Sequence, residues 1–281
     1  MRYWFFVLSI VYTCSLGAKE TLRIGVQLEG QKHVEQFIAG REISSIDDYS
    51  GEFAYRDVVE QVLLLQALHF GGFRGNIELV QADHYKRRLR LLEQGLLDLS
   101  VTGVWLSDAL LIKDNLYISR PLLRDGEAEA GFYVHQNNTR ARQVNDKFGL
   151  QRLNAISNKN WQIDWRIMSA IGFAHLDSVS QFTQMTDMIM KGRSDVMLAT
   201  FYNTEDLSFS QDNETFVPIH GLKVKLPGSR HFVVSKAAGN SEIFACVQRG
   251  LKELRSRGLI NKAYRQSGYI NEKVKHWMVI R

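Results

Sequence analysis

A helix that ends in glycine and is followed three residues later by aspartate and an apolar strand occurs twice in this chain. The first copy contains Gly95 and Asp98, and the second contains Gly192 and Asp195. Glycine at the end of a helix is typical of a left-handed stop, and a short apolar run after it suits a strand of a buried parallel sheet. A unit built twice predicts two related lobes.

The first copy begins with the basic stretch "RRLRLLEQG". Its positive charge suggests a polyanion-binding site as one hypothesis. Leu89, Leu92 and Leu96 fall on one face of a helix, which leaves the arginines on the solvated side. Leu96 is also placed to fold back on Leu91 in a Schellman motif after Gly95. The stretch is therefore predicted to be scaffold.

Strands alternate with helices along the rest of the chain, which favours an α/β protein with largely parallel sheets. We expect a long polar loop over residues 29–51 and a second polar loop after residue 202. The expected strands cover residues 21–28, 76–82, 99–101, 131–134, 153–157, 196–200 and 230–236. The expected helices lie within residues 53–72, 85–95, 158–173, 178–192 and 241–269, the last interrupted at Gly258.

The N-terminus has the pattern of a secretory signal peptide: Arg2, an uncharged apolar run to Leu16, and small residues before a polar stretch. Cleavage is expected after Gly17 or Ala18, and the run is shorter than the ~20 residues of a membrane helix. Lipid attachment at Cys14 is the minor alternative. The mature chain is thus expected in the periplasm, as a monomer.

Composition excludes several classes of function. The net charge is +5, with 35 basic and 30 acidic residues interspersed, whereas nucleic-acid binding needs clustered basic residues. None of the eight histidines has a partner at metal-ligand spacing, and no nucleophile elbow, phosphate loop or dinucleotide motif is present. Cys246 lies among apolar helix positions, as a buried thiol does. We expect no cofactor, no metal and no catalytic residue.

In open parallel sheets, ligands bind beyond the carboxyl ends of strands and near helix N-termini, where free N–H groups point outward. Aromatic walls with a few polar groups are typical of small-molecule pockets. The residues that meet these conditions are Glu29, Tyr85, Arg87, Thr102, Gly103, Trp105, Ser107, Asn158, Trp161, Asp164, Thr200, Phe201 and Tyr202. Ordinary core packing is the alternative for each aromatic residue, and solvent exposure is the alternative for Arg87.

Four segments together resemble the periplasmic solute-binding proteins of family 3, the receptors of amino-acid-type ABC importers. They are "LRIGV", "YKRRLRLLEQGLLDLSVTG", "ISRPLL" and "LKELRSRGLINKAYRQ", in that order. The resemblance implies a two-lobed type II periplasmic-binding-protein-like fold, each lobe a mostly parallel sheet flanked by helices. It implies a signal peptide (1–18), a first lobe (19–128), a second lobe (129–234) and a C-terminal return to the first lobe (235–281). The chain crossings are expected near residues 127–131 and 229–235.

The family pattern carries a threonine followed three positions later by an arginine that clamps the ligand carboxylate. Here Ser107 can stand for the threonine, but Leu110 occupies the arginine position. A neutral side chain does not replace a bidentate guanidinium, so standard α-amino-acid binding is not expected.

We therefore expect a protein that captures a small polar molecule between hinged lobes, for an ABC permease or a membrane sensor. Two alternatives remain. One is a dehydratase-like enzyme on the same scaffold, with Glu29, Asp83 or Asp164 as acid or base. The other is a ligand-independent interaction module whose cleft is filled by its own side chains.

Overall fold

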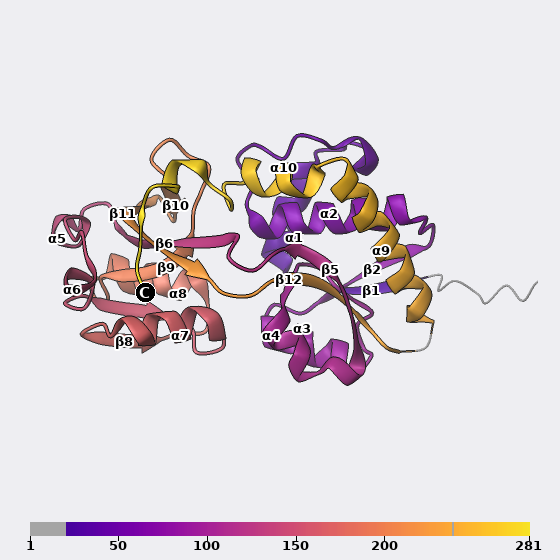
Figure 1. Ribbon diagram of the computed structural model, residues 1–281, viewed down its shortest axis with the longest axis horizontal. Helices are drawn as coiled ribbons and strands as arrows, with labels where there is room; N and C mark the ends of the chain where they lie inside the picture. Colours follow the sequence, from indigo (N-terminus) through magenta and orange to yellow (C-terminus); the bar gives the residue numbers. More distant parts are fainter. Residues whose placement is uncertain (1–20, 238) are drawn as a thin grey trace, which may run out of the picture.

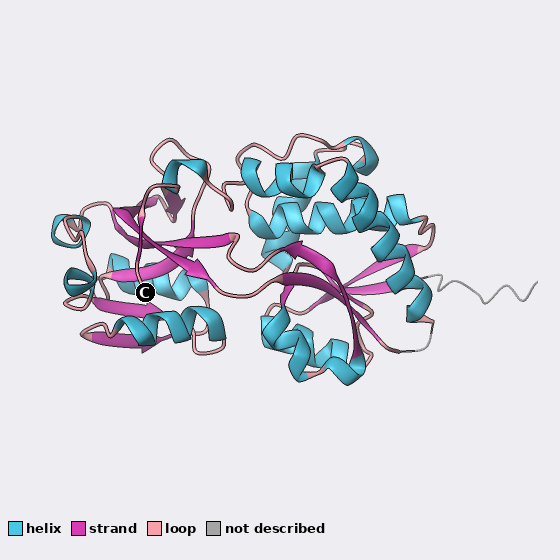
Figure 2. Ribbon diagram, in the orientation of Figure 1, coloured by secondary structure: helices cyan, strands magenta, loops and turns pink. Residues whose placement is uncertain are grey.

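The computed structural model describes residues 21–237 and 239–281, which form two lobes side by side (Figures 1 and 2). Each lobe has a central sheet with helices packed on it, and two extended strands pass between the lobes (Figure 1). The two-lobed α/β prediction is confirmed. The expected signal peptide and Cys14 lie outside the described residues.

The first lobe contains a six-stranded sheet in the order β2-β1-β3-β12-β4, with β5 also paired to β12. Its strands are β1 (Thr21–Val26), β2 (Asn76–Gln81), β3 (Leu99–Ser100), β4 (Val104–Trp105), β5 (Leu116–Leu123) and β12 (Arg230–Ser235). Its helices are α1 (Leu28–Ile38), η1 (Ile43–Ser45), α2 (Arg56–Gly71), α3 (Tyr85–Glu93), α4 (Leu106–Leu111), η2 (Lys113–Asn115), α9 (Asn240–Ser256) and α10 (Leu259–Gln266).

The second lobe contains a seven-stranded sheet in the order β10-β11-β6-β9-β7-β8, with β13 paired to β11. Its strands are β6 (Ala128–His135), β7 (Asn154–Ser157), β8 (His175–Ser178), β9 (Val196–Thr200), β10 (Phe209–Gln211), β11 (Glu214–Leu226) and β13 (Met278–Val279). Its helices are α5 (Thr139–Arg142), α6 (Lys147–Leu150), α7 (Gln162–Ile171), α8 (Phe182–Met190) and η3 (Glu272–Val274).

The two sheets share one plan. In each, a central strand pairs in parallel with two neighbours: β1 with β2 and β3, and β7 with β8 and β9. A strand that leads to the other lobe then pairs in the antiparallel sense, β12 on β3 and β6 on β9. The predicted parallel pairing thus holds for the three-stranded half of each sheet, and the linking strands add antiparallel pairs.

The repeated glycine–aspartate unit is the same structure in both lobes. Gly95 and Gly192 have φ values of 70° and 65°, the left-handed conformation that favours glycine. The amide of Leu96 donates to the carbonyl of Leu91 at 2.9 Å, as a Schellman stop requires, and Arg193 repeats this bond to Met188 at 2.9 Å. Leu96 itself is 52% exposed, because the helix ends before it and its side chain leaves the apolar face.

Each aspartate of the repeat ties its strand to the central strand of its sheet. The Asp98 carboxylate accepts the amide of Arg23 at 2.8 Å, and the Asp195 carboxylate accepts the amide of Asn154 at 2.9 Å. The carboxylate satisfies a backbone donor at the point where the ladder begins. Asp98 also pairs with the Arg23 guanidinium at 3.0 Å and is fully buried.

The close packing of α2 against α9 forms the main core of the first lobe. Glycine permits this approach, because a Cβ at Gly250 would lie 1.8 Å from the carbonyl oxygen of Ala67. Cys246 lies in the same contact, is 4% exposed, and has its pKa raised by burial. The prediction of a buried structural thiol is confirmed.

The chain crosses between the lobes slightly earlier than expected. Residues 124–127 join β5 to β6, and residues 227–229 join β11 to β12. The Asp125 carboxylate accepts the amide of Gly228 at 2.6 Å, which links the two crossings. Because β12 pairs with β3, β4 and β5, residues 230–234 belong to the first lobe, and the expected boundary at 234 is corrected to the crossing at 227–229.

Other expectations also need correction. The stretch 29–51 contains α1 and η1 rather than a continuous loop, because its apolar residues, including Val34 and Phe37, pack on the core. The second expected loop contains β10 and β11, and β8 was not anticipated. The C-terminal return is only partial, since β13 adds to the sheet of the second lobe.

Candidate functional site

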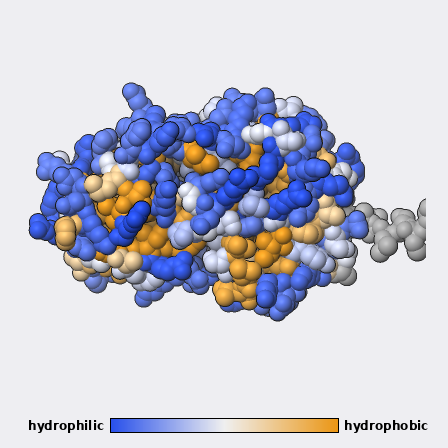
Figure 3. All heavy atoms as spheres, in the orientation of Figure 1, coloured by the Kyte–Doolittle hydropathy of each residue, from blue (hydrophilic) through white to orange (hydrophobic). Residues whose placement is uncertain are grey.

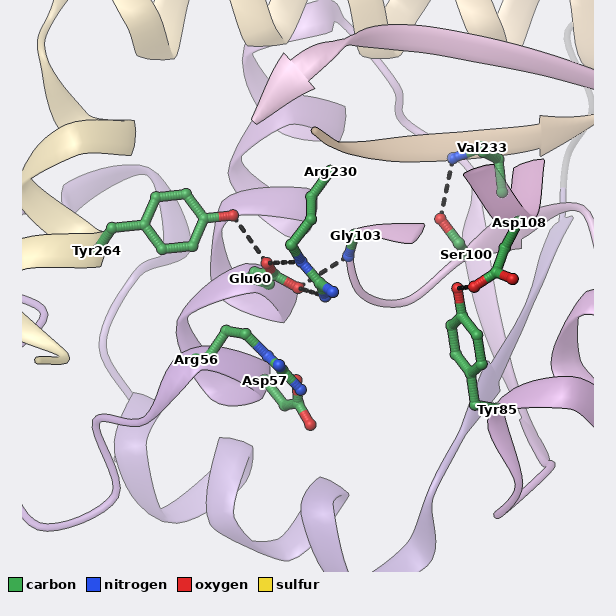
Figure 4. A network of polar contacts seen from close by, with 10 residues as sticks. All are labelled: Arg56, Asp57, Glu60, Tyr85, Ser100, Gly103, Asp108, Arg230, Val233 and Tyr264. Carbon is green, nitrogen blue, oxygen red and sulfur yellow. Dashed lines mark hydrogen bonds and ion pairs between the residues drawn. The ribbon is translucent and has the colours of Figure 1, made fainter. Parts of the chain in front are cut away.

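The first lobe presents a buried ion pair where α2 meets the start of β12. The Arg230 guanidinium donates to the two carboxylate oxygens of Glu60 at 3.0 and 2.9 Å, and the side chains are 4% and 0% exposed (Figure 4). The hydroxyl of Tyr264 and the amide of Gly103 also donate to this carboxylate, at 2.7 and 2.8 Å. Burial alone would lower the pKa of Arg230, but the charge and hydrogen bonds of Glu60 raise it.

Trp105 covers this ion pair from β4. The Arg230 guanidinium lies 5.0 Å from the centroid of the Trp105 ring, and the two residues are register partners in the sheet. This distance places the guanidinium over the indole ring, in a cation–π contact. Trp105 remains partly exposed, so one face of this assembly is open to a small molecule.

A second charged pair begins α2. Arg56 and Asp57 occupy its first turn, and the Arg56 Nε donates to the Asp57 carboxylate at 2.8 Å. The Arg56 guanidinium also lies 5.6 Å from the ring centroid of Tyr269. Burial raises the pKa of Asp57, but the charge and hydrogen bond of Arg56, together with the charges of Arg230 and Arg88, lower it overall. The Asp57 side chain keeps 48% of its exposure, so this pair lines a solvent-accessible space.

The second lobe contributes Asp164, in the first turn of α7, and Tyr202, two residues after the end of β9. Desolvation raises the pKa of Asp164 to about 6, although the charges of Arg56 and Arg230 lower it in part. Burial likewise raises the pKa of Tyr202 to about 12, and Arg56 again acts in the opposite direction. Arg56 and Arg230 belong to the first lobe, so their charges act on these second-lobe groups from across the lobe boundary.

Several predicted residues have structural roles. Tyr85 donates its hydroxyl to the buried Asp108 at 2.9 Å (Figure 4). Lys86 pairs with the same carboxylate at 3.2 Å. Burial raises the pKa of Tyr85. Asn158 is 4% exposed and donates to the carbonyl of Ser180 at 2.9 Å, so it shapes the turn before α7. Phe201 is 2% exposed and belongs to the core of the second lobe.

The two neighbouring arginines of α3 differ in their surroundings, and Arg87 follows its alternative of solvent exposure. Arg87 is exposed, whereas its neighbour Arg88 donates to the carbonyls of Ala82 and Asp83 at 2.8 and 3.2 Å, at the carboxyl end of β2. Its charge also lowers the pKa of Asp57, which places Arg88 at the inner face of the lobe. Burial lowers the pKa of Arg88 itself.

The remaining predicted residues differ in their exposure. Thr102, Thr200 and Trp161 are partly buried, and Ser107 is exposed on α4. Glu29 lies in α1, and its side chain is not described. Leu110, which stands where the family pattern has arginine, is 49% exposed. Figure 3 shows an apolar patch over α3 and α4, to which Leu110 and the 71% exposed Leu111 belong.

Sequence reasoning missed four charged residues at this end of the first lobe: Arg56, Asp57, Glu60 and Arg230. One signal was present for Glu60, a carboxylate in the otherwise apolar run "VVEQVLLL" of a helix. Its partner Arg230 is 170 residues away and carries no local signal.

Within residues 21–237 and 239–281, no group of three or more His, Cys, Asp or Glu side chains is arranged to hold a metal ion. The helices of this part of the chain are all too short or too polar to cross a bilayer.

No protein-family model and no curated protein matches the sequence. Solved structures do match, over most of the chain. The probable amino-acid ABC transporter extracellular-binding protein ytmK of Bacillus subtilis is 12% identical, with a TM-score of 0.58 and coverage of 89% of this chain and 98% of that chain. A double mutant of the VFT2 domain of Bordetella pertussis BvgS is 14% identical, with a TM-score of 0.56 and coverage of 88% and 93%.

The ancestral amino acid-binding protein AncCDT-1, a precursor of cyclohexadienyl dehydratase, is 14% identical, with a TM-score of 0.56 and coverage of 89% and 96%. At this level of identity the similarity concerns the fold. The chain therefore has the two-lobed type II fold of periplasmic solute-binding domains.

Proposed function

We propose that this protein is exported to the periplasm and captures a small polar solute between its two lobes. The solute is then delivered to an ABC permease or reported to a membrane sensor. The two-lobed fold supports this proposal, because two lobes joined by short chain crossings can act as a hinge whose closed state is stabilised by ligand contacts from both lobes. Leader cleavage after Gly17 or Ala18 and a single-chain state are part of the proposal.

The carboxylate of Asp164 is the observation that carries the proposal. It faces the charges of the first lobe, yet desolvation keeps its pKa near 6. Arg56 and Arg230, the guanidiniums that act on it, are each already paired, with Asp57 and with Glu60. A desolvated carboxylate gains most from a ligand that brings its own positive charge or strong hydrogen-bond donors.

The ligand class follows from the remaining charges. At the position of the carboxylate clamp this chain has Leu110, and Arg230 is committed to Glu60. We therefore propose an amine-bearing solute whose recognition depends on its cationic group and not on an α-carboxylate. The partly exposed rings of Trp105 and Tyr202 offer apolar and cation–π contacts to its carbon frame.

A thermal-shift screen tests this function. Polyamines, basic and neutral amino acids, organic acids and short peptides would be added at pH 7.5, and a ligand at 100 times its Kd should stabilise the protein by about 2.7 kcal/mol. Amines should give the shift, Asp164→Asn should lose it, and Asp187→Asn, an exposed change on α8, should keep it. Absence of any shift, or equal shifts in both variants, would contradict the proposal and favour the ligand-independent interaction module.

The dehydratase-like alternative keeps one supporting observation. Of the two candidate acids whose side chains the structure describes, Asp164 has a raised pKa, which a general acid at neutral pH requires. The pKa of the other, Asp83, is lowered by hydrogen bonds from Gln81 and Leu28. Proton NMR of any stabilising compound, incubated with the protein for a day, separates the two functions. A binding protein returns the compound unchanged, and an enzyme converts it.

A further inference from the structure

The C-terminal segment connects the two lobes a third time. Helix α10 packs on α9 and α2 in the first lobe, and β13 pairs with β11 in the second. Residues 267–281 therefore run from one lobe to the other. In Figure 1 this yellow segment leaves α10 along the upper edge of the view, away from the strands that link β5 to β6 and β11 to β12. We call residues 267–281 the strap.

The strap is anchored firmly in the second lobe. Val274 is fully buried, and its carbonyl accepts the Lys223 Nζ at 2.7 Å. The same Lys223 is 4% exposed and pairs with Glu129 at 2.9 Å, so the strap completes the environment of a buried amine. Trp277 packs edge-on against Phe201, with ring centroids 5.4 Å apart.

The strap has almost no spare length between its attachment to the first lobe and its attachment to the second. The amide of Ile270 donates to the carbonyl of Tyr264 in the first lobe at 2.9 Å. The next residue, Asn271, donates its side-chain amide to the carbonyl of Tyr202 in the second lobe at 3.3 Å. Consecutive residues of the strap are thus hydrogen-bonded to opposite lobes. Because one residue of extended chain spans at most ~3.6 Å, the chain between these two bonds has little length to give.

The lobes also touch directly beside the strap. The Asn203 side chain, from the second lobe, donates to the carbonyl of Gln266 at the end of α10 at 2.8 Å. A Cβ added at Gly268 would lie 2.6 Å from the amide nitrogen of Asn203 and 2.8 Å from the carbonyl carbon of Tyr202. The contact between the lobes here is as tight as glycine allows.

A third tether changes the mechanics of a hinge. Two crossing strands define an axis about which the lobes can rotate, and a link away from that axis opposes the rotation. Opening would have to stretch a strap with no spare length or break the hydrogen bonds of Asn203 and Asn271. In a hinge with two crossings, ligand contacts from both lobes can favour the closed state. In this chain, the strap and the hydrogen bonds of Asn203 and Asn271 link the lobes without a ligand.

We propose that the strap holds the two lobes together in the absence of ligand, so that opening of the cleft requires its release at residues 268–271. The ligand-free protein then populates the arrangement described above, and entry of a solute follows strap release. The proposal concerns the ligand-free chain, so it can fail or hold independently of the solute-binding function.

The test compares two glycine substitutions that differ only in what the new methyl group meets. Gly268→Ala places it against the second lobe, whereas Gly258→Ala, at a similar φ of 72° against 78°, meets nothing within 4 Å. Both carry the same left-handed strain. Spin labels at Leu111→Cys on α4 and Phe148→Cys on α6, positions 71% and 73% exposed, report the distance between the lobes.

The labels would be attached in a Cys14→Ser background, where Cys246 is buried and protected. Pulsed electron resonance on the full chain without ligand should give one short distance for the parent and for Gly258→Ala. Gly268→Ala should add a longer-distance population, and so should the double variant Asn203→Ala/Asn271→Ala, which removes both side-chain ties. Asn145→Ala, an exposed change in the second lobe, should leave the distance unchanged.

The double asparagine variant decides the question if Gly268→Ala fails to fold. The proposal is overturned if both strap variants keep the parent distance. It is also overturned if Gly258→Ala lengthens the distance as much as Gly268→Ala, because strain and not contact would then be the cause. It is overturned as well if the parent protein already shows the longer population.

Discussion

Replacement of Asp164 by asparagine should stabilise the ligand-free protein, and the gain should depend on pH. The carboxylate has an ordinary pKa of 3.8 in the unfolded chain and about 6 in the folded protein, where desolvation opposes its charge. A folded pKa that is raised for an acid means that the folded state binds the proton more tightly. Stability is therefore lost as pH rises from about 4 to about 6, where the folded group also ionises.

The magnitude follows from the size of the shift. About two pKa units correspond to about 3 kcal/mol at pH 8, where the side chain is ionised in both states, and to about 1 kcal/mol at pH 4.5. Asparagine keeps the shape and carries no charge. It gives up about 0.5 kcal/mol of favourable interaction with the N-terminus of α7. The expected net gain is about 2–3 kcal/mol at pH 8 and less than about 1 kcal/mol at pH 4.5.

Thermal unfolding followed by circular dichroism measures this difference. For a chain of this size, a gain of that order raises Tm by about 3–5 °C at pH 8. Asp187→Asn, whose carboxylate is 48% exposed on α8, should change Tm by less than about 2 °C at either pH. An Asp164→Asn protein that is no more stable at pH 8, or that gains equally at both pH values, would show that the carboxylate is not desolvated.

Three further predictions concern the ion pairs and the aromatic wall. Glu60→Gln should lower the free energy of unfolding, measured in urea, by about 3–5 kcal/mol, because it leaves the 4% exposed Arg230 without a counter-charge. A loss below about 1 kcal/mol would contradict a buried ion pair. Asp98→Ala should lower the free energy of unfolding by about 2–3 kcal/mol, and Asp195→Ala by only about 1–2 kcal/mol. The reason is that Asp98 is fully buried, whereas the Arg140 partner of Asp195 is 68% exposed. The reverse order of the two losses would contradict this reasoning. Trp105→Ala and Trp161→Ala should reduce the Tm shift given by a stabilising amine while the proteins stay folded, and unchanged shifts would remove these rings from the site.

The sequence by itself determined the repeated half-sheet plan. A glycine that ends a helix and an aspartate three residues later act through local geometry, so Gly95 with Asp98 and Gly192 with Asp195 were readable from spacing alone. The amphipathic patterns of α2, α7, α8 and α9 were readable for the same reason, because a helix repeats its apolar face every few residues. The sheet that each strand joins is not local, which is why β12 was assigned to the wrong lobe.

The site itself was decided by the tertiary structure. Proximity to a strand end selected the partly exposed Trp105, Asp164 and Tyr202, but it also selected the core residue Phe201 and the exposed Arg87. No sequence rule connects Glu60 to Arg230, because the pair forms only when the chain has crossed to the second lobe and returned.

The strap shows the same division. The sequence pattern predicted two helices broken at Gly258 in this part of the chain, and α9 and α10 form there. The position of the residues that follow them involves the buried Lys223 of the second lobe. Lys223 needs acceptors inside the second lobe, and the carbonyl of Val274 supplies one. Spacing and periodicity fix elements whose partners are near in sequence. Contacts between distant residues, which create both the charged space and its third tether, exist only once the whole chain has folded.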